Sequence, residues 1–178
     1  MLGPTLTGAR VTLEAAQPED LPIFRRWFAD MQVSRYLLMR FPPSEQQEAE
    51  WYSRTAESQS AVHWSVKLNG VTIGNTGIDQ IDPVHRHAVT GMVIGERSEW
   101  RKGYATEAVQ LRTRYAFEEL GLETLYSQSH AANVGMHKAL EHSGYEQVGR
   151  LRRHVYGGGE WHDVYIFEVL RQDWVARH

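Results

Sequence analysis

Residues 64–73 impose the strongest constraint on the fold. Apolar residues alternate with other residues over positions 64–68, and again over 71–73 on the far side of Asn69 and Gly70. A two-residue Asn-Gly connection between such segments is typical of a type I′ turn, because both residues adopt a positive φ. We therefore predict an antiparallel hairpin here, so any fold of this chain must contain a β-sheet.

Strand and helix signals alternate along the rest of the chain. Pro18 and the acids after it are typical of a helix start, and Ser44 with Gln47 forms a capping box. Asn133 is a preferred N-cap residue, and Gly144 lies where a helix often ends in a left-handed residue. These signals predict strands at about 10–13, 64–68, 71–81, 87–94, 125–129, 146–156 and 161–170, and helices at about 18–28, 44–58, 103–120 and after Asn133. Helices both precede and interrupt the strands, which indicates an α/β fold with a mixed, mostly antiparallel central sheet flanked by helices.

Length and composition fit one globular domain. The chain has 178 residues, 42% hydrophobic and 23% charged, so we expect residues 1–178 to form a single domain with an ordinary core. The net charge is -3 and the pI is near 6.3, which argues against a nucleic-acid partner. The chain has no cysteine, which excludes a disulfide framework, a Cys-based zinc or redox site, and an acyl-enzyme formed on a thiol.

The sequence predicts neither a membrane segment nor a metal site. The first residues lack the basic and apolar regions of a signal peptide, and no run of about 18 apolar residues follows. We therefore expect a cytoplasmic protein without a membrane partner. His85 and His87 have the spacing of metal ligands, but no third ligand is evident, so no metal is predicted. The oligomeric state stays open, with a homodimer as the commonest soluble assembly.

The segment 96–106 joins the strand at 87–94 to the best helix of the chain and has the features of an anion site. Gly103 at the helix start lets a ligand approach the backbone, and the first four N–H groups of any helix lack intrahelical partners. Arg101 and Lys102 lie at the positive end of the helix dipole, where a cation costs about 0.3 to 1 kcal/mol. A bound anion would reverse this cost, whereas without one the segment is a solvated loop with two exposed charges.

The kind of anion follows from the motifs that the chain lacks. It has neither a GxxxxGK[ST] loop nor a GxGxxG after a strand, which argues against the common nucleotide sites. Backbone amides, one glycine and two cations suit a diphosphate better than a triphosphate with magnesium. Coenzyme A fits this description.

Three motifs resemble those of the GNAT N-acetyltransferase family. Residues 101–108, RKGYATEA, resemble its acyl-CoA loop, R/Q-x-x-G-x-G/A. Asn133 followed by Gly144 and Tyr145 resembles its second motif, an asparagine eleven residues before a Gly-aromatic pair. Residues 161–164, WHDV, resemble the branch that contains ribosomal-protein-alanine and polyamine acetyltransferases. The motifs occur in the family's order, and the resemblance covers nearly the whole chain, so it implies a GNAT-like fold.

The resemblance also implies an acetyl-CoA site. Backbone groups of the strand at 87–94 would pair with the pantetheine arm, and one N–H would polarise the thioester carbonyl, an effect typically worth about 3 to 4 kcal/mol. The loop and the helix start would hold the pyrophosphate, and the asparagine would lie where the sheet splits. The residues implied for cofactor binding are Met92, Val93, Ile94, Arg97, Arg101, Lys102, Gly103, Tyr104, Ala105, Thr106 and Asn133.

The chain departs from the family at the positions for proton transfer. The family usually places a glutamate on the strand as general base, and Val89 stands at that position; its neighbour Thr90 cannot replace a carboxylate. Family members also carry a serine or tyrosine on the helix after the asparagine, which protonates the leaving thiolate. Met136 and Leu140 stand at those two positions.

Three explanations are open for the missing groups. The acceptor amine could lose its proton to solvent, with proximity supplying several kcal/mol. Another residue could act: His130 is the first choice, because the ordinary histidine pKa of about 6.5 suits a proton acceptor near neutrality, and Asp163 is the second. Without a catalytic role, His130 would be a loop histidine and Asp163 would anchor the final hairpin. The third explanation is that the chain binds acyl-CoA and catalyses nothing.

The expected function is transfer of acetyl from acetyl-CoA to a primary amine by direct attack in a ternary complex. The acceptor is a protein N-terminus, a polyamine or another small amine, and the alternative is a catalytically silent acyl-CoA-binding module. Four acids on the second helix would either attract a cationic acceptor or form a solvated face: Glu45, Glu48, Glu50 and Glu57. Four apolar residues would either line an acceptor groove or pack in the core: Met39, Phe41, Trp51 and Tyr52.

Overall fold

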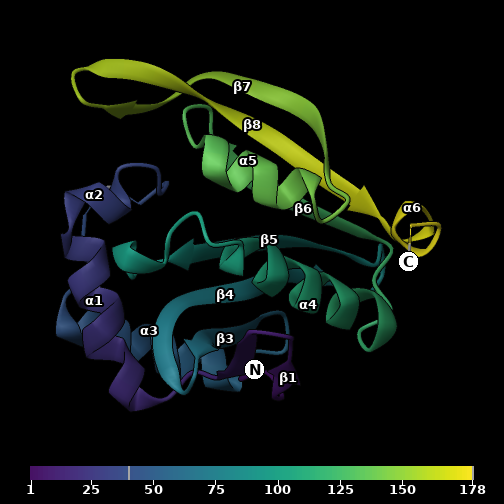
Figure 1. The fold of residues 1–178 in the computed structure, drawn as a ribbon, viewed down its shortest axis with the longest axis horizontal. Coiled ribbons are helices and arrows are strands. Elements are labelled where there is room, and N and C mark those ends of the chain that lie inside the picture. The colour runs from purple at the N-terminus through teal and green to yellow at the C-terminus, as the bar shows by residue number, and fades with distance from the viewer. Residues whose placement is uncertain (40, 178) are drawn as a thin grey trace.

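The computed structural model describes residues 1–39 and 41–177 and contains one eight-stranded sheet (Figure 1). Its strands are β1 (Leu6–Thr7), β2 (Val11–Ala15), β3 (Val62–Leu68), β4 (Val71–Asp82), β5 (His87–Ile94), β6 (Thr124–His130), β7 (Glu146–Gly157) and β8 (Glu160–Leu170). The spatial order is β1-β2-β3-β4-β5-β6-β8-β7, and β5 with β6 is the parallel pair among antiparallel ones. The predicted mixed, mostly antiparallel sheet is confirmed.

The helices of the described residues include the four that the sequence predicted. They are α1 (Leu21–Ala29), α2 (Met31–Ser34), α3 (Glu45–Glu57), α4 (Tyr104–Glu118), α5 (Val134–Glu141) and α6 (Arg171–Val175), with short 3-10 turns at Pro18–Asp20 and Arg97–Glu99. Ser44 Oγ accepts from the N–H of Gln47, whose side chain accepts from the N–H of Ser44, so the predicted capping box is present. Gly144 ends the α5 region with a φ of 89°, in the predicted left-handed conformation.

Both predicted hairpins form. Asn69 and Gly70 have φ values of 50° and 79° between β3 and β4, as a type I′ turn requires. The last two strands are joined through Gly158 and Gly159, which also have positive φ values. The strand expected at 10–13 is displaced to Val11–Ala15, and the sequence did not predict β1, α2, α6 or the 3-10 turn after β5. These elements are too short to show a helix or strand period.

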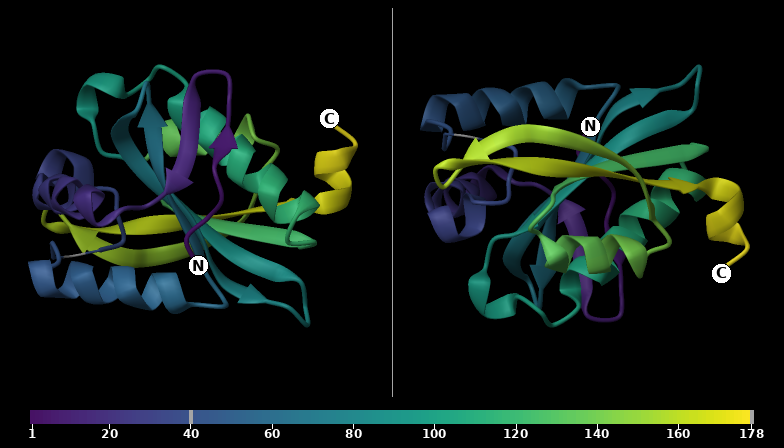
Figure 2. Two further views of the ribbon diagram at one scale, coloured as in Figure 1. Left: turned by 90° about the horizontal axis from the view of Figure 1, so that it is seen from below. Right: turned by 90° about the horizontal axis from the view of Figure 1, so that it is seen from above.

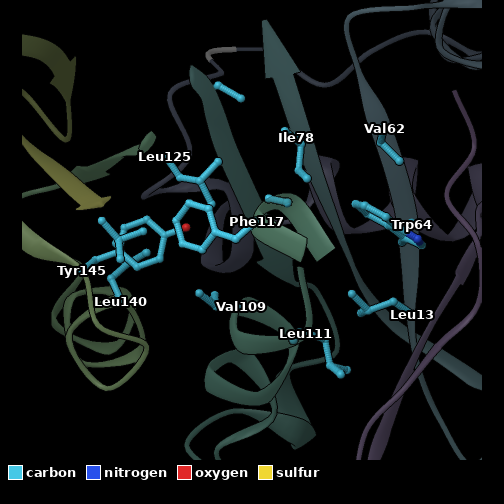
Figure 3. Close-up of a cluster of buried hydrophobic side chains, with 14 of the residues drawn as sticks. Leu13, Val62, Trp64, Ile78, Val109, Leu111, Phe117, Leu125, Leu140 and Tyr145 are labelled. Atoms are coloured by element: carbon cyan, nitrogen blue, oxygen red, sulfur yellow. The ribbon is translucent and has the colours of Figure 1, made fainter. Parts of the chain in front are cut away.

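Helices cover the two faces of the sheet in separate layers. Figure 2 shows α3 on one face and α4 and α5 on the other. The main core lies between the sheet and α4, where Trp64, Phe117 and Leu125 are among the buried side chains (Figure 3). A second cluster around Phe24 and Trp27 lies under α1. None of the helices in the described part of the chain is long and apolar enough to cross a bilayer.

Candidate functional site

The sheet opens between β5 and β6. The two strands pair over residues 87–90 and 124–127, and the pairing stops there. At this point Thr90 Oγ1 donates to Tyr126 O (3.0 Å) and Ser127 Oγ donates to Thr90 O (3.2 Å). The remainder of each strand has no ladder partner in the other, so one backbone edge of β5 faces the split.

Met92, Val93 and Ile94 lie on this free stretch of β5. Val93 belongs to the cluster under α1, while Met92 and Ile94 pack against the main core. Side-chain packing therefore occupies both faces of the strand, and the backbone groups of its edge are available to bind a ligand. The geometry fits the pantetheine site that the resemblance implies.

Arg112 on α4 supports β5 where the split begins, a contact that sequence reasoning missed. The side chain is 1% exposed, and its guanidinium donates to Thr76 Oγ1 (2.8 Å) and to Gly91 O (2.9 Å). Thr76 Oγ1 also donates to Gly91 O (3.0 Å). Arg112 follows Ala108 by one helical turn, so its position on the apolar stripe of the helix was the available signal.

The start of α4 presents a run of free backbone donors. Gly103 caps the helix with a φ of 85°, and Arg101 also has a positive φ, 63°. Within the described chain, the N–H groups of residues 101–106 have no hydrogen-bond acceptor. Such a run at a helix N-terminus is a ready anion site. Gly103, Tyr104, Ala105 and Thr106, which the resemblance implied for cofactor binding, form this helix start.

We call the run of free N–H groups at residues 101–106 the cradle. The charged side chains around it are partly neutralised. Lys102 Nζ lies 3.0 Å from Glu99 Oε2, and Arg97 lies 3.8 Å from Asp30 Oδ2. Arg101 makes no hydrogen bond or ion pair with any described residue, so it is the cation of this group with a free charge.

Arg10 fixes the loop from the neighbouring turn. One of its guanidinium nitrogens donates to Lys102 O (2.8 Å), and its Nε donates to Glu107 Oε2 (2.8 Å). Burial raises the pKa of Glu107, but hydrogen bonds from the N–H groups of Arg10 and Val11 and from the Arg10 side chain outweigh it and lower the pKa overall. Glu107 therefore stays ionised in the first turn of α4, where the dipole favours an anion.

The loop motif needs one correction. The family pattern has its arginine or glutamine three residues before the glycine, and that residue is Trp100; Arg101 is two before. Trp100 Nε1 donates to Ile94 O (2.7 Å), and the guanidinium carbon of Arg97 lies 6.0 Å from the centre of its ring. The indole therefore ties the loop to the end of β5.

Asn133 lies at the end of β6, as the resemblance implies, and caps α5 by accepting from the N–H of Met136 (3.2 Å). On α5, Met136 packs against the main core and Leu140 is fully buried in it. Val89 pairs with Asp79 in the sheet. None of the three positions where the family holds a proton-transfer residue offers one here.

His130 is buried at the end of β6. Its Nδ1 accepts from the N–H of Ala132 (3.1 Å), and its ring lies 4.6 Å from that of His162 and 5.2 Å from that of Tyr36, centre to centre. Burial, then His162 and His137, lower the pKa of His130, so the ring is neutral near pH 7. The proton is then on Nε2, which suits a hydrogen-bond donor and disfavours the predicted role of proton acceptor. Neither these histidines nor any other group of three or more His, Asp and Glu side chains within the described residues could hold a metal ion.

Asp163 anchors the last hairpin. Its carboxylate accepts from Arg150 Nε (2.5 Å) and from the N–H of Arg153 (2.7 Å). The bond from Arg153 N–H, aided by Arg150 and Arg152, lowers its pKa. A lowered pKa makes Asp163 a weaker proton acceptor, which disfavours its predicted role as second choice for the base. Of the two readings of this residue, the anchoring one describes the structure.

A cavity of about 850 Å³ lies between the sheet, α1 and α3. Met39, Phe41 and Trp51 line it, as the acceptor-groove interpretation expected, whereas Tyr52 packs in the cluster under α1 instead. Gly91, Met92 and Val93 form part of its wall. The β5 segment that edges the split therefore also borders this cavity.

Glu48 is not part of a solvated helix face. The side chain lines the cavity, the residue is 4% exposed, and its Oε2 has no partner within the described chain. Burial raises its pKa to about 7, against a smaller opposing effect of Arg25. Glu45, by contrast, is exposed and pairs with Arg25 (3.1 Å), and Glu50 and Glu57 are exposed.

Comparison with known proteins gives a consistent result. A family model described as an acetyltransferase (GNAT) domain matches residues 10–146. The chain is 28% identical to an uncharacterized N-acetyltransferase, p20, of Bacillus licheniformis over 97% of this chain and 99% of that protein. It is 23% identical to spermidine N(1)-acetyltransferase of Escherichia coli K12, over 94% of this chain and 90% of the enzyme.

A solved structure has the same fold. The spermidine N-acetyltransferase of Vibrio cholerae, in complex with CoA and spermine, superposes with a TM-score of 0.87 at 20% identity and covers 94% of this chain and 99% of its own.

Proposed function

The chain belongs to the GNAT family of acetyltransferases and is an acetyl-CoA-dependent N-acetyltransferase; from this premise we propose that it transfers acetyl to a primary amine by direct attack in a ternary complex. The amine belongs to a protein N-terminus, a polyamine or another small molecule. Residues 1–178 act as one catalytic domain.

The observation that supports this proposal is the position of β5. Its edge faces the split, its end leads into the cradle at residues 101–106, and Gly91, Met92 and Val93 border the cavity under α3. A thioester held along the edge of β5 would therefore lie beside a chamber large enough for an acceptor. Direct attack needs this arrangement, because both reactants must be bound together.

In this proposal, the acetyl-CoA site comprises the residues that the resemblance implied. The N–H groups of residues 101–106 hold the diphosphate with Arg101, Lys102 and Arg97 around it. The edge of β5 at Met92, Val93 and Ile94 holds the pantetheine arm, and Asn133 keeps the start of α5 beside it. Arg10 is an addition, since it fixes the loop through Lys102 O and Glu107.

In this proposal, His130 stabilises the leaving thiolate. Its Nε2–H donates a hydrogen bond toward the departing thiolate, because Nδ1 is engaged by Ala132. Replacing His130 with Ala should lower turnover about tenfold with little change in CoA affinity, and His130→Gln, which keeps a donor, should recover part of the loss. Equal rates in all three proteins would remove His130 from the scheme.

The second candidate function is a silent acyl-CoA-binding module, favoured by the apolar residues Val89, Met136 and Leu140 at the family's proton-transfer positions. Acetyl-CoA is mixed with spermidine, a short peptide with a free N-terminus, and phenethylamine, and released CoA is followed with a thiol reagent. The protein has no thiol that could interfere. Thiol release with one of these amines supports the enzyme. Thermal stabilisation by CoA without release with any amine supports the module.

A further inference from the structure

The missing base has a substitute one strand away. Val89, where the family holds a glutamate, is the register partner of Asp79 on β4. Directly opposite residues of antiparallel strands lie on the same face, with Cβ atoms about 5 Å apart. A carboxylate is therefore present beside the expected position, and it lines the cavity under α3.

Asp79 does not face the cavity alone. Its Oδ1 lies 2.8 Å from Nε2 of His63, a residue of β3 whose side chain is 14% exposed. A carboxylate is an acceptor only, so the proton of this bond belongs to Nε2, and the lone pair of a neutral ring is on Nδ1. Nδ1 has no partner within the described chain. The pair thus has the arrangement of an imidazole base oriented by a carboxylate.

Two glycines place the imidazole within the chamber. His63 pairs with Gly77 in the sheet, and Gly77 pairs with Gly91 on β5, so the three residues form a row across three strands. A Cβ atom on Gly77 would lie 2.4 Å from Cε1 and Nδ1 of His63, so the ring lies directly over this glycine. A Cβ on Gly91 would meet nothing within 4 Å. The row therefore offers an open place on β5 next to the ring.

The other walls hold the ring and leave room for an amine. Trp51 contacts the His63 ring edge-on, with centres 5.2 Å apart, and so restricts its rotation. Glu48, one turn before Trp51 on α3, lines the same cavity with its unpartnered Oε2, which suits a bound ammonium group. Among the described residues, the ionisable groups that share this cavity with His63 are Asp79, Glu48, Glu50 and Arg54.

We propose that His63, oriented by Asp79, is the general base of the acetyl transfer, an inference that rests on the proposed function. The acceptor amine lies over Gly91 and attacks the thioester carbon. As the N–C bond forms, the nitrogen gives a proton to Nδ1 of His63, and Asp79 stabilises the imidazolium. The C–S bond breaks, and the CoA thiolate leaves with the electron pair and takes a proton from water. His63 is the catalytic residue, and Asp79 is a positioning residue.

Kinetics with matched variants test this assignment. Acetyl transfer to whichever panel amine gives the fastest thiol release is compared in wild type, His63→Gln, Asp79→Asn and the control His85→Gln, whose histidine lies in the exposed turn after β4. General base catalysis typically contributes about 10² to 10⁴ in rate. We expect kcat to fall at least about 10²-fold in His63→Gln and at least tenfold in Asp79→Asn, with KM for acetyl-CoA unchanged. The control should retain the wild-type rate.

Two readouts separate catalysis from structural support. In His63→Gly, added imidazole should restore part of the lost rate, whereas it should not accelerate His85→Gln. In the ¹⁵N spectra of histidine-labelled wild type without ligand, His63 should show the Nε2–H tautomer, and Asp79→Asn should weaken that preference.

The outcomes distinguish this inference from the proposed function. Wild type that releases no thiol with any amine overturns both. Active wild type together with wild-type kcat in His63→Gln, no rescue by imidazole in a folded His63→Gly, or an Nδ1–H tautomer overturns the role of His63 and leaves the proposed function intact.

Discussion

Gly103 is the residue at which backbone shape and charge at the cradle can be tested separately. Its φ of 85° disfavours any side chain, and an added Cβ would lie 3.2 Å from a guanidinium nitrogen of Arg10. Gly103→Ala and Gly103→Asp introduce the same backbone strain, which costs of order 1 to 3 kcal/mol. Only the aspartate adds a negative charge where the diphosphate would bind.

We expect Gly103→Asp to abolish binding of CoA and Gly103→Ala to weaken it roughly tenfold, as measured by isothermal titration calorimetry. Circular dichroism checks that both variants remain folded. If the aspartate variant binds CoA as tightly as the alanine variant, the diphosphate does not lie at this helix start.

Glu48 should make the stability of the protein depend on pH. Its pKa is raised from an ordinary 4.5 to about 7 in the folded protein, so between these values the folded state binds more protons than the unfolded state. The contribution of this group to stability is then greatest below pH 4.5 and is lost as the pH rises through 7. The loss amounts to roughly 1 to 3 kcal/mol.

Glu48→Gln removes this titration. We therefore expect the free energy of unfolding to fall less between pH 5 and pH 8 in the variant than in wild type, as measured by urea denaturation. Glu50→Gln, an exposed acid of the same helix, is the control and should follow wild type. A Glu48→Gln protein with the wild-type pH dependence would show that the buried carboxyl does not titrate in this range.

The carboxylate of Asp163 holds the irregular part of the β7–β8 hairpin in place. The ladder shifts register between Leu151 and Val155, and Asp163 bonds both Arg150 and the N–H of Arg153 across this irregular stretch. Arg153 has a positive φ of 51°, so the bond to its N–H holds an uncommon conformation.

Asp163→Ala should speed amide hydrogen exchange in residues 150–164 by about tenfold. The variant removes the acceptor to which Arg150 Nε and the N–H of Arg153 donate in the bulged stretch. Glu160→Ala, at the exposed turn of the same hairpin, should change little. CoA affinity should stay within a factor of three. Exchange rates equal to those of wild type would remove the anchoring role of Asp163.

The sequence predicted the long helices and strands but not the contacts between segments that are distant in the chain. The bounds predicted for β5 agree with the structure at both ends, and those predicted for α4 agree to within two residues. Both predictions rest on periodicity and capping residues, which are local signals. The sequence pointed to His130 through its position in the chain. The hydrogen bond from the N–H of Ala132 to its Nδ1 is evident only in the structure. The pair of His63 and Asp79 joins two strands through the sheet register, and no motif marks it. The burial of Glu48 depends on α3 packing over the sheet, which the sequence could not specify.

For the whole molecule, the consequence of the split is that the two halves of the sheet meet through one short parallel ladder. That ladder spans residues 87–90 and 124–127, with two side-chain hydrogen bonds at its open end. A ligand that lies along the edge of β5 and reaches β6 would connect the halves. One that binds at the cradle alone would contact only the loop and the start of α4.

Acetyl-CoA and adenosine 3′-phosphate 5′-diphosphate separate these two cases, because both carry the diphosphate and only the former has a pantetheine arm. A ligand that binds only the native state at 100 times its Kd stabilises by about 2.7 kcal/mol. At equal saturation, we expect acetyl-CoA to slow amide exchange at residues 91–94, 101–106 and 128–130, and adenosine 3′-phosphate 5′-diphosphate to slow it at residues 101–106 alone. Hydrogen-exchange mass spectrometry measures both. If the two ligands protect the same amides, the pantetheine arm does not enter the split, and acetyl delivery to the cavity under α3 must follow another path.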